Sequence, residues 1–211
     1  MFTGIVRGRY CVSSVERLPA FARVEIPLDE QVRGVLEIGS SVAVDGVCLT
    51  VTGLSNTSAH FDIMQETLRV TTLSDIAVGR MVNIEPSLST QQDISGHIVS
   101  GHIDTTATIC SLDRPDEQNC TVTFQVEPAW TRYIFQKGYL AINGCSLTVG
   151  TVDKKKGQFS VYLIPETVRR TTFGIVEVGD RVNIEVERQT QVIVDTIRES
   201  LEEFRDQLIG G

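Results

Sequence analysis

Cys48 and Ser146 carry the side chains of this sequence that most directly suggest chemistry. They hold the same place in two similar segments of the chain, and each offers a nucleophilic or hydrogen-bonding heteroatom. A hydroxyl follows two residues later in both segments, at Thr50 and at Thr148. Because successive side chains of a strand point to opposite faces, each hydroxyl would share a face with the residue two before it. A cysteine in a strand is more often a small buried thiol, but the matched polar groups favour two related polar pockets.

Two of the three histidines, His97 and His102, lie close together in the sequence GHIVSGH at residues 96–102. In an extended segment their spacing would place them on opposite faces, which argues against a metal ion held by both. Imidazole titrates near neutral pH and therefore suits proton transfer. The plainer interpretation is a polar linker between two domains.

An internal repeat organises these residues. Three segments of the first half return in the second half in the same order and at nearly constant spacing, and a fourth match pairs residues 3–5 with 100–103. The sequence therefore predicts two copies of one domain, residues 1–97 and 98–187, followed by a tail at residues 188–211. The three matching pairs are residues 45–51 with 143–149, 64–72 with 164–172, and 78–85 with 178–185.

Each copy is predicted to be all-β. Its short apolar runs are rich in β-branched residues, and several alternate apolar with polar side chains. Asp45-Gly46 and Asn143-Gly144 lie between two such runs and predict two-residue hairpin turns, because both positions tolerate positive φ. Gly79 and Gly179 are expected in the turn before the last strand. Several short strands in so short a copy favour a small closed barrel over an open sheet with exposed edges.

The tail predicts one amphipathic helix. From Thr190, a candidate N-cap, apolar residues recur at three- and four-residue spacing, including Val194, Ile197, Leu201 and Phe204, while the other face is charged. Such a helix must bury its apolar side. A helix that lies outside both copies of a repeat is well placed to pack against the same helix of other subunits. The sequence therefore favours an oligomer.

The overall charge restricts the partners. The formal net charge of −8 argues against a nucleic-acid surface, which needs a concentration of Lys and Arg.

No apolar segment is long enough to span a bilayer, and the N-terminus has no basic region followed by an apolar stretch, so a soluble cytoplasmic protein is expected. The five cysteines form no CxxC pair and are expected to be free thiols. The sequence contains no metal-ligand cluster, dinucleotide fingerprint or P-loop, so no metal or cofactor is expected.

Five motifs are spread along the chain: MFTGIV at residues 1–6, DGVCLTV at 45–51, GHIVSGH at 96–102, GCSLT at 144–148 and LIPET at 163–167. Together they resemble the riboflavin synthase α-chain family of lumazine-binding repeats, and the resemblance covers both copies and the tail. It implies an all-β fold of two tandem, similar, six-stranded antiparallel Greek-key β-barrels followed by a C-terminal α-helix. It also implies a homotrimer formed through that helix, with an active site where the N-terminal barrel of one subunit meets the C-terminal barrel of its neighbour.

The activity implied by the resemblance is the transfer of a four-carbon unit between two molecules of 6,7-dimethyl-8-ribityllumazine. The products are riboflavin and 5-amino-6-ribitylamino-pyrimidinedione, and the reaction is the last step of riboflavin biosynthesis. It needs neither a metal nor a redox cofactor, in keeping with the motifs that this sequence lacks. An enzyme that joins two copies of one substrate can use two related pockets held face to face. Lumazine synthase is a further partner that the resemblance suggests.

The resemblance places Cys48, His102 and Ser146 in the catalytic machinery. His102 would carry a proton, because the C7 methyl group of the substrate must lose one to become a carbon nucleophile; a covalent role for Cys48 is the less favoured alternative. Sequence alone would make Lys137 a solvated surface lysine, and the 62–67 and 162–167 stretches ordinary strand ends. The implied lumazine contacts are Gly4, Ile5, Val6, Ser41, Cys48, Leu49, Thr50, Asp62, Ile63, Met64, Gln65, Glu66, Thr67, Gly101, His102, Ile103, Lys137, Ser146, Leu147, Thr148, Tyr162, Leu163, Ile164, Pro165, Glu166 and Thr167.

One residue departs from the family pattern. Members of the family often carry Asp where this chain has Asn143, and an amide cannot act as a base. If the reaction requires a carboxylate, Glu185 or Asp62 is expected to supply it. Two other functions stay open: a non-catalytic antenna protein of the same fold that binds a lumazine or flavin, and a generic barrel module that binds a protein or oligonucleotide. Because both copies carry polar residues, the sequence favours the enzyme over the antenna protein.

Overall fold

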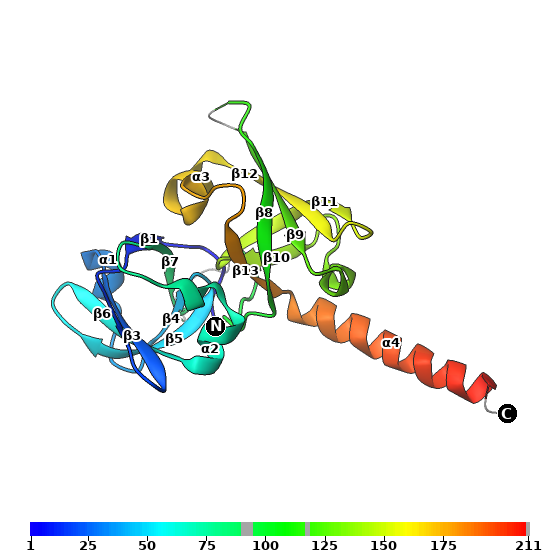
Figure 1. The fold of residues 1–211 in the computed structure, drawn as a ribbon, viewed down its shortest axis with the longest axis horizontal. Coiled ribbons are helices and arrows are strands. Elements are labelled where there is room, and N and C mark those ends of the chain that lie inside the picture. The colour runs from blue at the N-terminus through cyan, green and yellow to red at the C-terminus, as the bar shows by residue number, and fades with distance from the viewer. Residues whose placement is uncertain (90–94, 117–118, 210–211) are drawn as a thin grey trace.

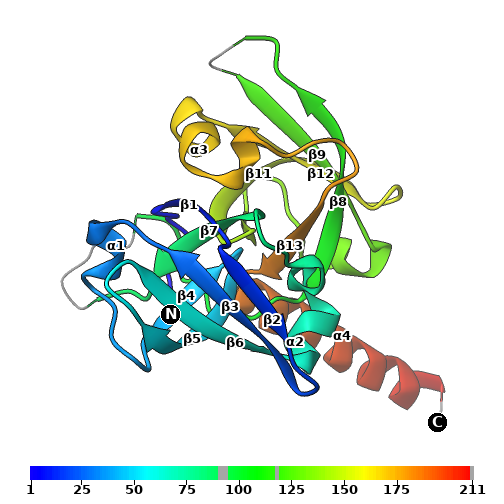
Figure 2. The ribbon, with the colours of Figure 1, turned by 60° about the vertical axis from the view of Figure 1, so that its left-hand side comes forward.

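The chain forms two β lobes and one long terminal helix (Figure 1). This computed structural model describes residues 1–89, 95–116 and 119–209. The first repeat builds one lobe and the second repeat builds the other, and the two lobes remain distinct when the molecule is turned (Figure 2). The terminal helix leaves the second lobe and extends away from both (Figure 1).

Within the described part of the first repeat, seven strands form one antiparallel sheet. The elements are β1 (Gly8–Cys11), β2 (Ser14–Arg17), β3 (Phe21–Pro27), α1 (Glu30–Arg33), β4 (Ser41–Val44), β5 (Val47–Leu54), β6 (Ser58–Met64), α2 (Gln65–Val70), a 3₁₀ turn (Thr72–Asp75) and β7 (Met81–Pro86). The strand order is β1-β7-β4-β5-β6-β3-β2, so the two edge strands are consecutive in the chain. Between them, the N–H of Val12 donates to Arg80 beside β7, and the N–H of Ser13 donates to Glu25 on β3. The chain therefore passes directly from one edge strand of the curled sheet to the other.

Within the described part of the second repeat, six strands close into a barrel in the order β10-β11-β12-β9-β8-β13. The elements are β8 (Thr105–Asp113), β9 (Cys120–Val126), a 3₁₀ turn (Pro128–Tyr133), β10 (Tyr139–Ile142), β11 (Cys145–Asp153), β12 (Gln158–Leu163), α3 (Pro165–Arg170), a 3₁₀ turn (Thr172–Gly174) and β13 (Arg181–Val186). Strand β8 runs unbroken where the first repeat has β1 and β2, because a register shift between Ile109 and Ser111 lets it bend from one neighbour to the other. The all-β fold with tandem repeats and a terminal helix is confirmed. The predicted six-stranded barrel is found in the second repeat, whereas the described part of the first repeat forms a seven-stranded half-barrel, because its edge is divided into the two short strands β1 and β2.

Each lobe has a hydrophobic core of its own. Strand β9 illustrates the cause, since every second residue from Cys120 to Val126 is buried. In the second core, the ring of Phe124 stacks on Phe159 at 5.1 Å between centroids and meets the edge of Phe173. Between the two cores, a small apolar cluster of Phe2, Ala43, Val99 and Ala141 brings residues of both repeats together, beside the polar contacts of the junction.

The two predicted hairpin turns are confirmed and meet at this junction. Asp45 and Gly46 have φ angles of 46° and 81°, and Asn143 and Gly144 have nearly the same values, 45° and 79°. Both turns therefore use the left-handed region that a tight hairpin requires. A Cβ atom on Gly46 would lie 2.6 Å from the backbone nitrogen of Gly144, so the turns pack against each other at a distance that only glycine permits.

The terminal helix α4 (Arg188–Ile209) begins two residues before the expected N-cap, Thr190. The carboxylate of Glu187 accepts hydrogen bonds from the backbone of Gln189 and Thr190 and supplies the cap instead. Near its start the helix is tied to the second lobe, where the hydroxyl of Tyr133 donates to Asp195 at 2.6 Å. Other apolar side chains of the helix are exposed in the single chain, including Ile193, Ile197, Leu201 and Phe204. In the described residues, no helix has the length and apolar character needed to cross a membrane.

Candidate functional site

Cys48 and Ser146 each lie beneath a glycine of the other repeat. The backbone N–H of Cys48 donates to the carbonyl of Gly101 at 2.9 Å, and that of Ser146 donates to Gly4 at 2.8 Å. Both glycines have positive φ, 83° and 75°. A Cβ on Gly101 would lie 2.6 Å from the Cβ of Cys48, and one on Gly4 would lie 2.5 Å from that of Ser146. The segment that opens each repeat therefore crosses to the hairpin of the other and lies directly on it.

A buried glutamate holds each crossing segment in place. Glu85, on β7, accepts hydrogen bonds from the N–H and hydroxyl of Thr3, both at 2.7 Å, and from the N–H of Gly4 at 3.1 Å. Glu185, on β13, makes the same three bonds to Ser100 and Gly101. Burial raises the pKa of Glu85, although these hydrogen bonds oppose the shift.

Glu185 and Asp62, the two carboxylates that could replace an acid at position 143, both already bind other groups. Glu185 is bound to the backbone of the crossing segment. Asp62 forms a two-point ion pair with Arg23, at 2.8 and 3.0 Å. Neither carboxylate is free to act as a base without first giving up these partners.

The pocket over Ser146 has a volume of about 200 Å³. It is lined by the crossing segment, by the start of β11, and by α3 with the residues on either side of it. Three lining residues, Cys145, Arg170 and Thr171, were not predicted, although the last two lie three and four residues after the motif at residues 163–167. Burial raises the pKa of the Cys145 thiol, which therefore stays protonated. The predicted residues that line this pocket are Gly4, Ile5, Val6, Ser146, Leu147, Ile164, Glu166 and Thr167.

His97 contacts the pocket residue Ser146, a relationship that the sequence analysis missed by treating His97 as part of a linker. Its Nδ1 lies 2.7 Å from the Oγ of Ser146, and its ring stacks on Tyr139 at 5.7 Å. Burial lowers the pKa of His97, while the negative charge of Glu187 opposes this shift. The available signal was that His97 lies in the same motif as His102.

The other residues predicted for the second repeat lie around the same hairpin. Thr148 is exposed and pairs with Tyr139 across β10 and β11. Lys137 is an exposed turn residue with a φ of 68°, and its N–H donates to the carbonyl of Val149. Tyr162 is exposed on β12, and Pro165 is the first residue of α3. Leu163 is buried in the core and can meet a ligand only through its backbone.

In the first repeat, the structure gathers part of the predicted set around Cys48. Ser41 and Thr50 are paired across β4 and β5, with Thr50 exposed. His102, which follows Gly101 on the crossing segment, is exposed. The half-buried Ile103 follows it and packs against the first core, Leu49 is buried there, and Thr67 is half-buried on α2.

Other predicted residues of the first repeat are engaged elsewhere. Ile63 is fully buried in the core, whereas Met64 is exposed at the start of α2. The side-chain amide of Gln65 donates to the carbonyls of Leu18 and Pro19, in the loop before β3. The carboxylate of Glu66 pairs with Arg69 one turn along α2.

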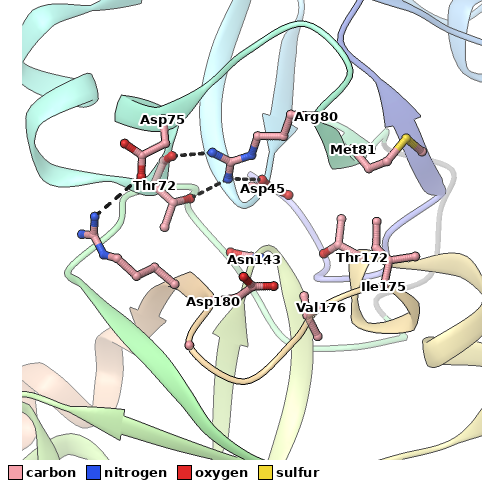
Figure 3. Close-up of a pocket in the computed structure, with 12 residues that line it drawn as sticks. Asp45, Thr72, Asp75, Arg80, Met81, Asn143, Thr172, Ile175, Val176 and Asp180 are labelled. Carbon is pink, nitrogen blue, oxygen red and sulfur yellow. Dashed lines mark hydrogen bonds and ion pairs between the residues drawn. The ribbon is translucent and has the colours of Figure 1, made fainter.

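Asn143 lies at the junction of the repeats, where it lines a second cavity of about 480 Å³ (Figure 3). Its Oδ1 accepts from the backbone N–H of Asn183 at 2.7 Å. The equivalent residue of the first repeat, Asp45, pairs with Arg80 at 3.1 Å, but the counterpart of that arginine is Asp180 (Figure 3). Burial raises the pKa of Asp45, and Arg80 opposes the shift. The amide at position 143 thus occurs in the repeat whose counterpart of Arg80 is an aspartate, although Arg181 also lines the cavity.

Among the residues that the structure describes, no group of three or more His, Cys, Asp and Glu side chains is arranged to hold a metal ion. Besides the guanidinium of Arg170, the polar groups of the Ser146 pocket are hydroxyls, a carboxylate and backbone groups. These suit a neutral, polar ligand that offers several donors and acceptors.

The fold and the site together define a protein of two β repeats, one of them a closed barrel, in which a segment of each repeat crosses to the equivalent hairpin of the other. A sequence profile of the lumazine binding domain matches residues 3–87 and again 100–187. The chain belongs to the lumazine-binding domain family.

Several relatives carry a specific name. The chain is 44% identical over 202 residues to the riboflavin synthase of Escherichia coli (strain K12), which covers 95% of this chain and 93% of that protein. It is 43% identical over 166 residues to the riboflavin synthase of Chlamydia pneumoniae, with 79% of this chain and 80% of that protein covered.

Solved structures of similar fold include LumP complexed with riboflavin, with a TM-score of 0.82, and LumP complexed with 6,7-dimethyl-8-(1′-D-ribityl) lumazine, with a TM-score of 0.80. Both are 24% identical to this chain and cover 89% of it, and the chain covers 100% and 99% of them. At that identity the likeness concerns the fold.

Proposed function

We propose that this chain catalyses the riboflavin synthase reaction. Two molecules of 6,7-dimethyl-8-ribityllumazine exchange a four-carbon unit and yield riboflavin and 5-amino-6-ribitylamino-pyrimidinedione, in the final step of riboflavin biosynthesis. Curated relatives with this name match the chain over nearly its whole length. The observation that carries the proposal is the equivalence of the sites at Cys48 and Ser146, because a reaction that consumes two copies of one substrate can use two related pockets.

Each pocket would bind one lumazine. Hydroxyl and backbone groups of the Ser146 pocket can pair with the ribityl chain and the uracil-like edge. Cys48, His102 and Ser146 are the proposed catalytic residues. The exposed imidazole of His102 would accept the proton that the C7 methyl group loses. No metal or redox cofactor enters this proposal.

A homotrimer is the proposed assembly, with α4 as the contact between subunits. The exposed apolar side chains of α4 need a partner surface, and Ile197, Leu201 and Phe204 lie beyond the contact with the second lobe. In this arrangement the first-repeat site of one subunit would face the second-repeat site of its neighbour. A cytoplasmic location and an association with lumazine synthase complete the proposal.

A non-catalytic antenna protein of the same fold is the second candidate, since LumP, which has this fold, is seen in complex with riboflavin and with a lumazine. The decisive experiment is incubation of the pure protein with 6,7-dimethyl-8-ribityllumazine, with and without EDTA, while riboflavin fluorescence is followed. Riboflavin should accumulate through many turnovers in both samples. Stoichiometric binding without turnover would contradict the proposed enzymatic activity and would support the antenna protein. Turnover abolished by EDTA would overturn the metal-free reaction.

Residue roles can be tested in the same assay with Cys48→Ser, His102→Gln and Ser146→Ala. The His102→Gln variant should lose most of its turnover, since the amide cannot take up a proton. Full turnover by this variant would overturn the assignment of His102 as the proton carrier.

A further inference from the structure

His97 is fixed on three sides against the second-repeat pocket. Its backbone N–H donates to the carbonyl of Thr3 at 3.1 Å, which ties it to the crossing segment that covers the pocket. Its ring stacks on Tyr139 with an interplanar angle of 22°. Its Nδ1 reaches the Oγ of Ser146 at 2.7 Å, a distance typical of a strong hydrogen bond. The orientation of the imidazole is therefore set by the fold.

The hydroxyl of Ser146 has one hydrogen to donate and two lone pairs to offer. A neutral imidazole can take that hydrogen on Nδ1 when its own proton is on Nε2. Burial favours the neutral form of His97 by lowering its pKa, while the carboxylate of Glu187 favours the charged form. Burial is the larger of the two effects.

We propose that His97 is a positioning residue for Ser146: it accepts the hydroxyl hydrogen on Nδ1 and so turns the lone pairs of Oγ toward the ligand. Ser146 then acts as a hydrogen-bond acceptor and selects a ligand group that donates, such as a ring N–H. This inference rests on the proposed function and adds a residue to the pocket of the second repeat.

The first repeat has no matching arrangement. Among the described residues, Cys48 has a thiol in place of the hydroxyl and no side-chain partner comparable to His97, while Phe2, Ala43 and Val99 pack around it. A thiol is a weak donor and a weak acceptor. The two pockets would therefore hold their lumazines with different polarity at this position, which distinguishes two otherwise identical substrate molecules.

The test compares His97→Phe with His97→Asn. Phenylalanine keeps the stacking on Tyr139 but removes Nδ1, whereas the Oδ1 of asparagine can replace Nδ1 as an acceptor. His97→Phe should lower kcat about tenfold, as expected for one hydrogen bond to a reacting complex, with less change in KM. His97→Asn should retain most of the wild-type kcat. A His97→Phe variant with wild-type kcat would overturn the inference.

Ser146→Ala provides the second arm. If His97 acts only through the serine, the double variant His97→Phe/Ser146→Ala should be no slower than Ser146→Ala alone. If the double variant is slower than Ser146→Ala by the same factor by which His97→Phe is slower than the wild type, the inference is wrong. Should His97→Phe not fold, His97→Gln moves its acceptor away from the Nδ1 position, and equal kcat values for the Gln and Asn variants would overturn it.

The wild type in the same assay separates this inference from the proposed function. A wild type without turnover contradicts the proposed function. A wild type that turns over together with an unaffected His97→Phe contradicts only the role of His97.

Discussion

Asn83 and Asn183 hold equivalent positions on β7 and β13 and bind reciprocally across the junction of the two repeats. The amide of Asn83 donates to the carbonyl of Asn143 at 2.9 Å, and its Oδ1 accepts from the N–H of Thr172 at 2.8 Å. Asn183 makes the matching bonds to the first repeat at the same two distances. Both side chains are almost fully buried. The repeats are thus joined by polar groups that pair only when both lobes are folded.

Replacing Asn83 with Ala should therefore destabilise the whole chain. The change leaves a buried backbone N–H and a buried carbonyl without partners, which costs about 1–3 kcal/mol. Asn183→Ala should cost a similar amount, because its bonds are equivalent. Urea unfolding measures both, and Asn56→Ala, at an exposed position in the loop before β6, is the control. Equal midpoints for Asn83→Ala and the control would contradict the role of the junction.

Gly4→Ala should damage the Ser146 pocket beyond its cost to the backbone. Gly39 also has a positive φ, 92°, but a Cβ there would meet nothing within 4 Å. Gly39→Ala therefore isolates the left-handed backbone cost of about 1–2 kcal/mol. Gly4→Ala adds the clash with Ser146 and should be less stable and bind lumazine more weakly in equilibrium titration. Similar stability and affinity for the two variants would show that the crossing segment has room to move.

The sequence predicts the local features of this fold well. The turns at Asp45-Gly46 and Asn143-Gly144 follow from residue type, because few residues adopt positive φ at two successive positions. The helix α4 follows from its apolar periodicity. The repeat predicts two related lobes, since equivalent residues have equivalent surroundings in each.

How the two copies contact each other cannot be predicted from the sequence in the same way. Gly4 and Ser146 are far apart in the sequence, and a repeat does not indicate whether a segment covers the hairpin of its own copy or that of the other. The contact between His97 and Ser146 also depends on this crossing, because His97 is bound to the backbone of Thr3. The polar junction depends on the packing of two complete lobes, which local patterns do not specify.

Arg188→Gln should slow the reaction through His102. Arg188, the first residue of α4, donates to the carbonyl of His102 at 2.9 Å and pairs with the buried carboxylate of Asp104 at 2.7 Å. The substitution frees the segment that carries the proposed proton carrier, and kcat should fall by up to about tenfold. Arg198→Gln removes an exposed pair within α4 and is the control. Equal kcat values for the two variants would show that the start of α4 does not influence the site.

The buried carboxylate of Glu85 should make stability depend on pH. Burial raises its pKa in the folded state, so on raising the pH the unfolded chain loses this proton first, near pH 4.5. The contribution of Glu85 to stability is therefore present below that pH and is lost as the pH rises through the folded-state pKa. Glu85→Gln cannot titrate, so the free energy of unfolding of the wild type should fall relative to this variant over that interval. Parallel pH profiles from urea unfolding would contradict the prediction.

Asn143→Asp should destabilise the junction, and Asp180→Arg should rescue it. The new carboxylate would be buried and would face the cavity that Asp180 also lines, and the position equivalent to Arg80 carries no cation to pair with it. An uncompensated buried charge costs about 3–5 kcal/mol. Adding Asp180→Arg would recreate the pair that Asp45 forms with Arg80 in the first repeat, where the arginine also donates to the carbonyl and hydroxyl of Thr72. Urea unfolding of the single and double variants gives the coupling energy, and a double variant as unstable as Asn143→Asp alone would show that the two sides of the junction are not equivalent.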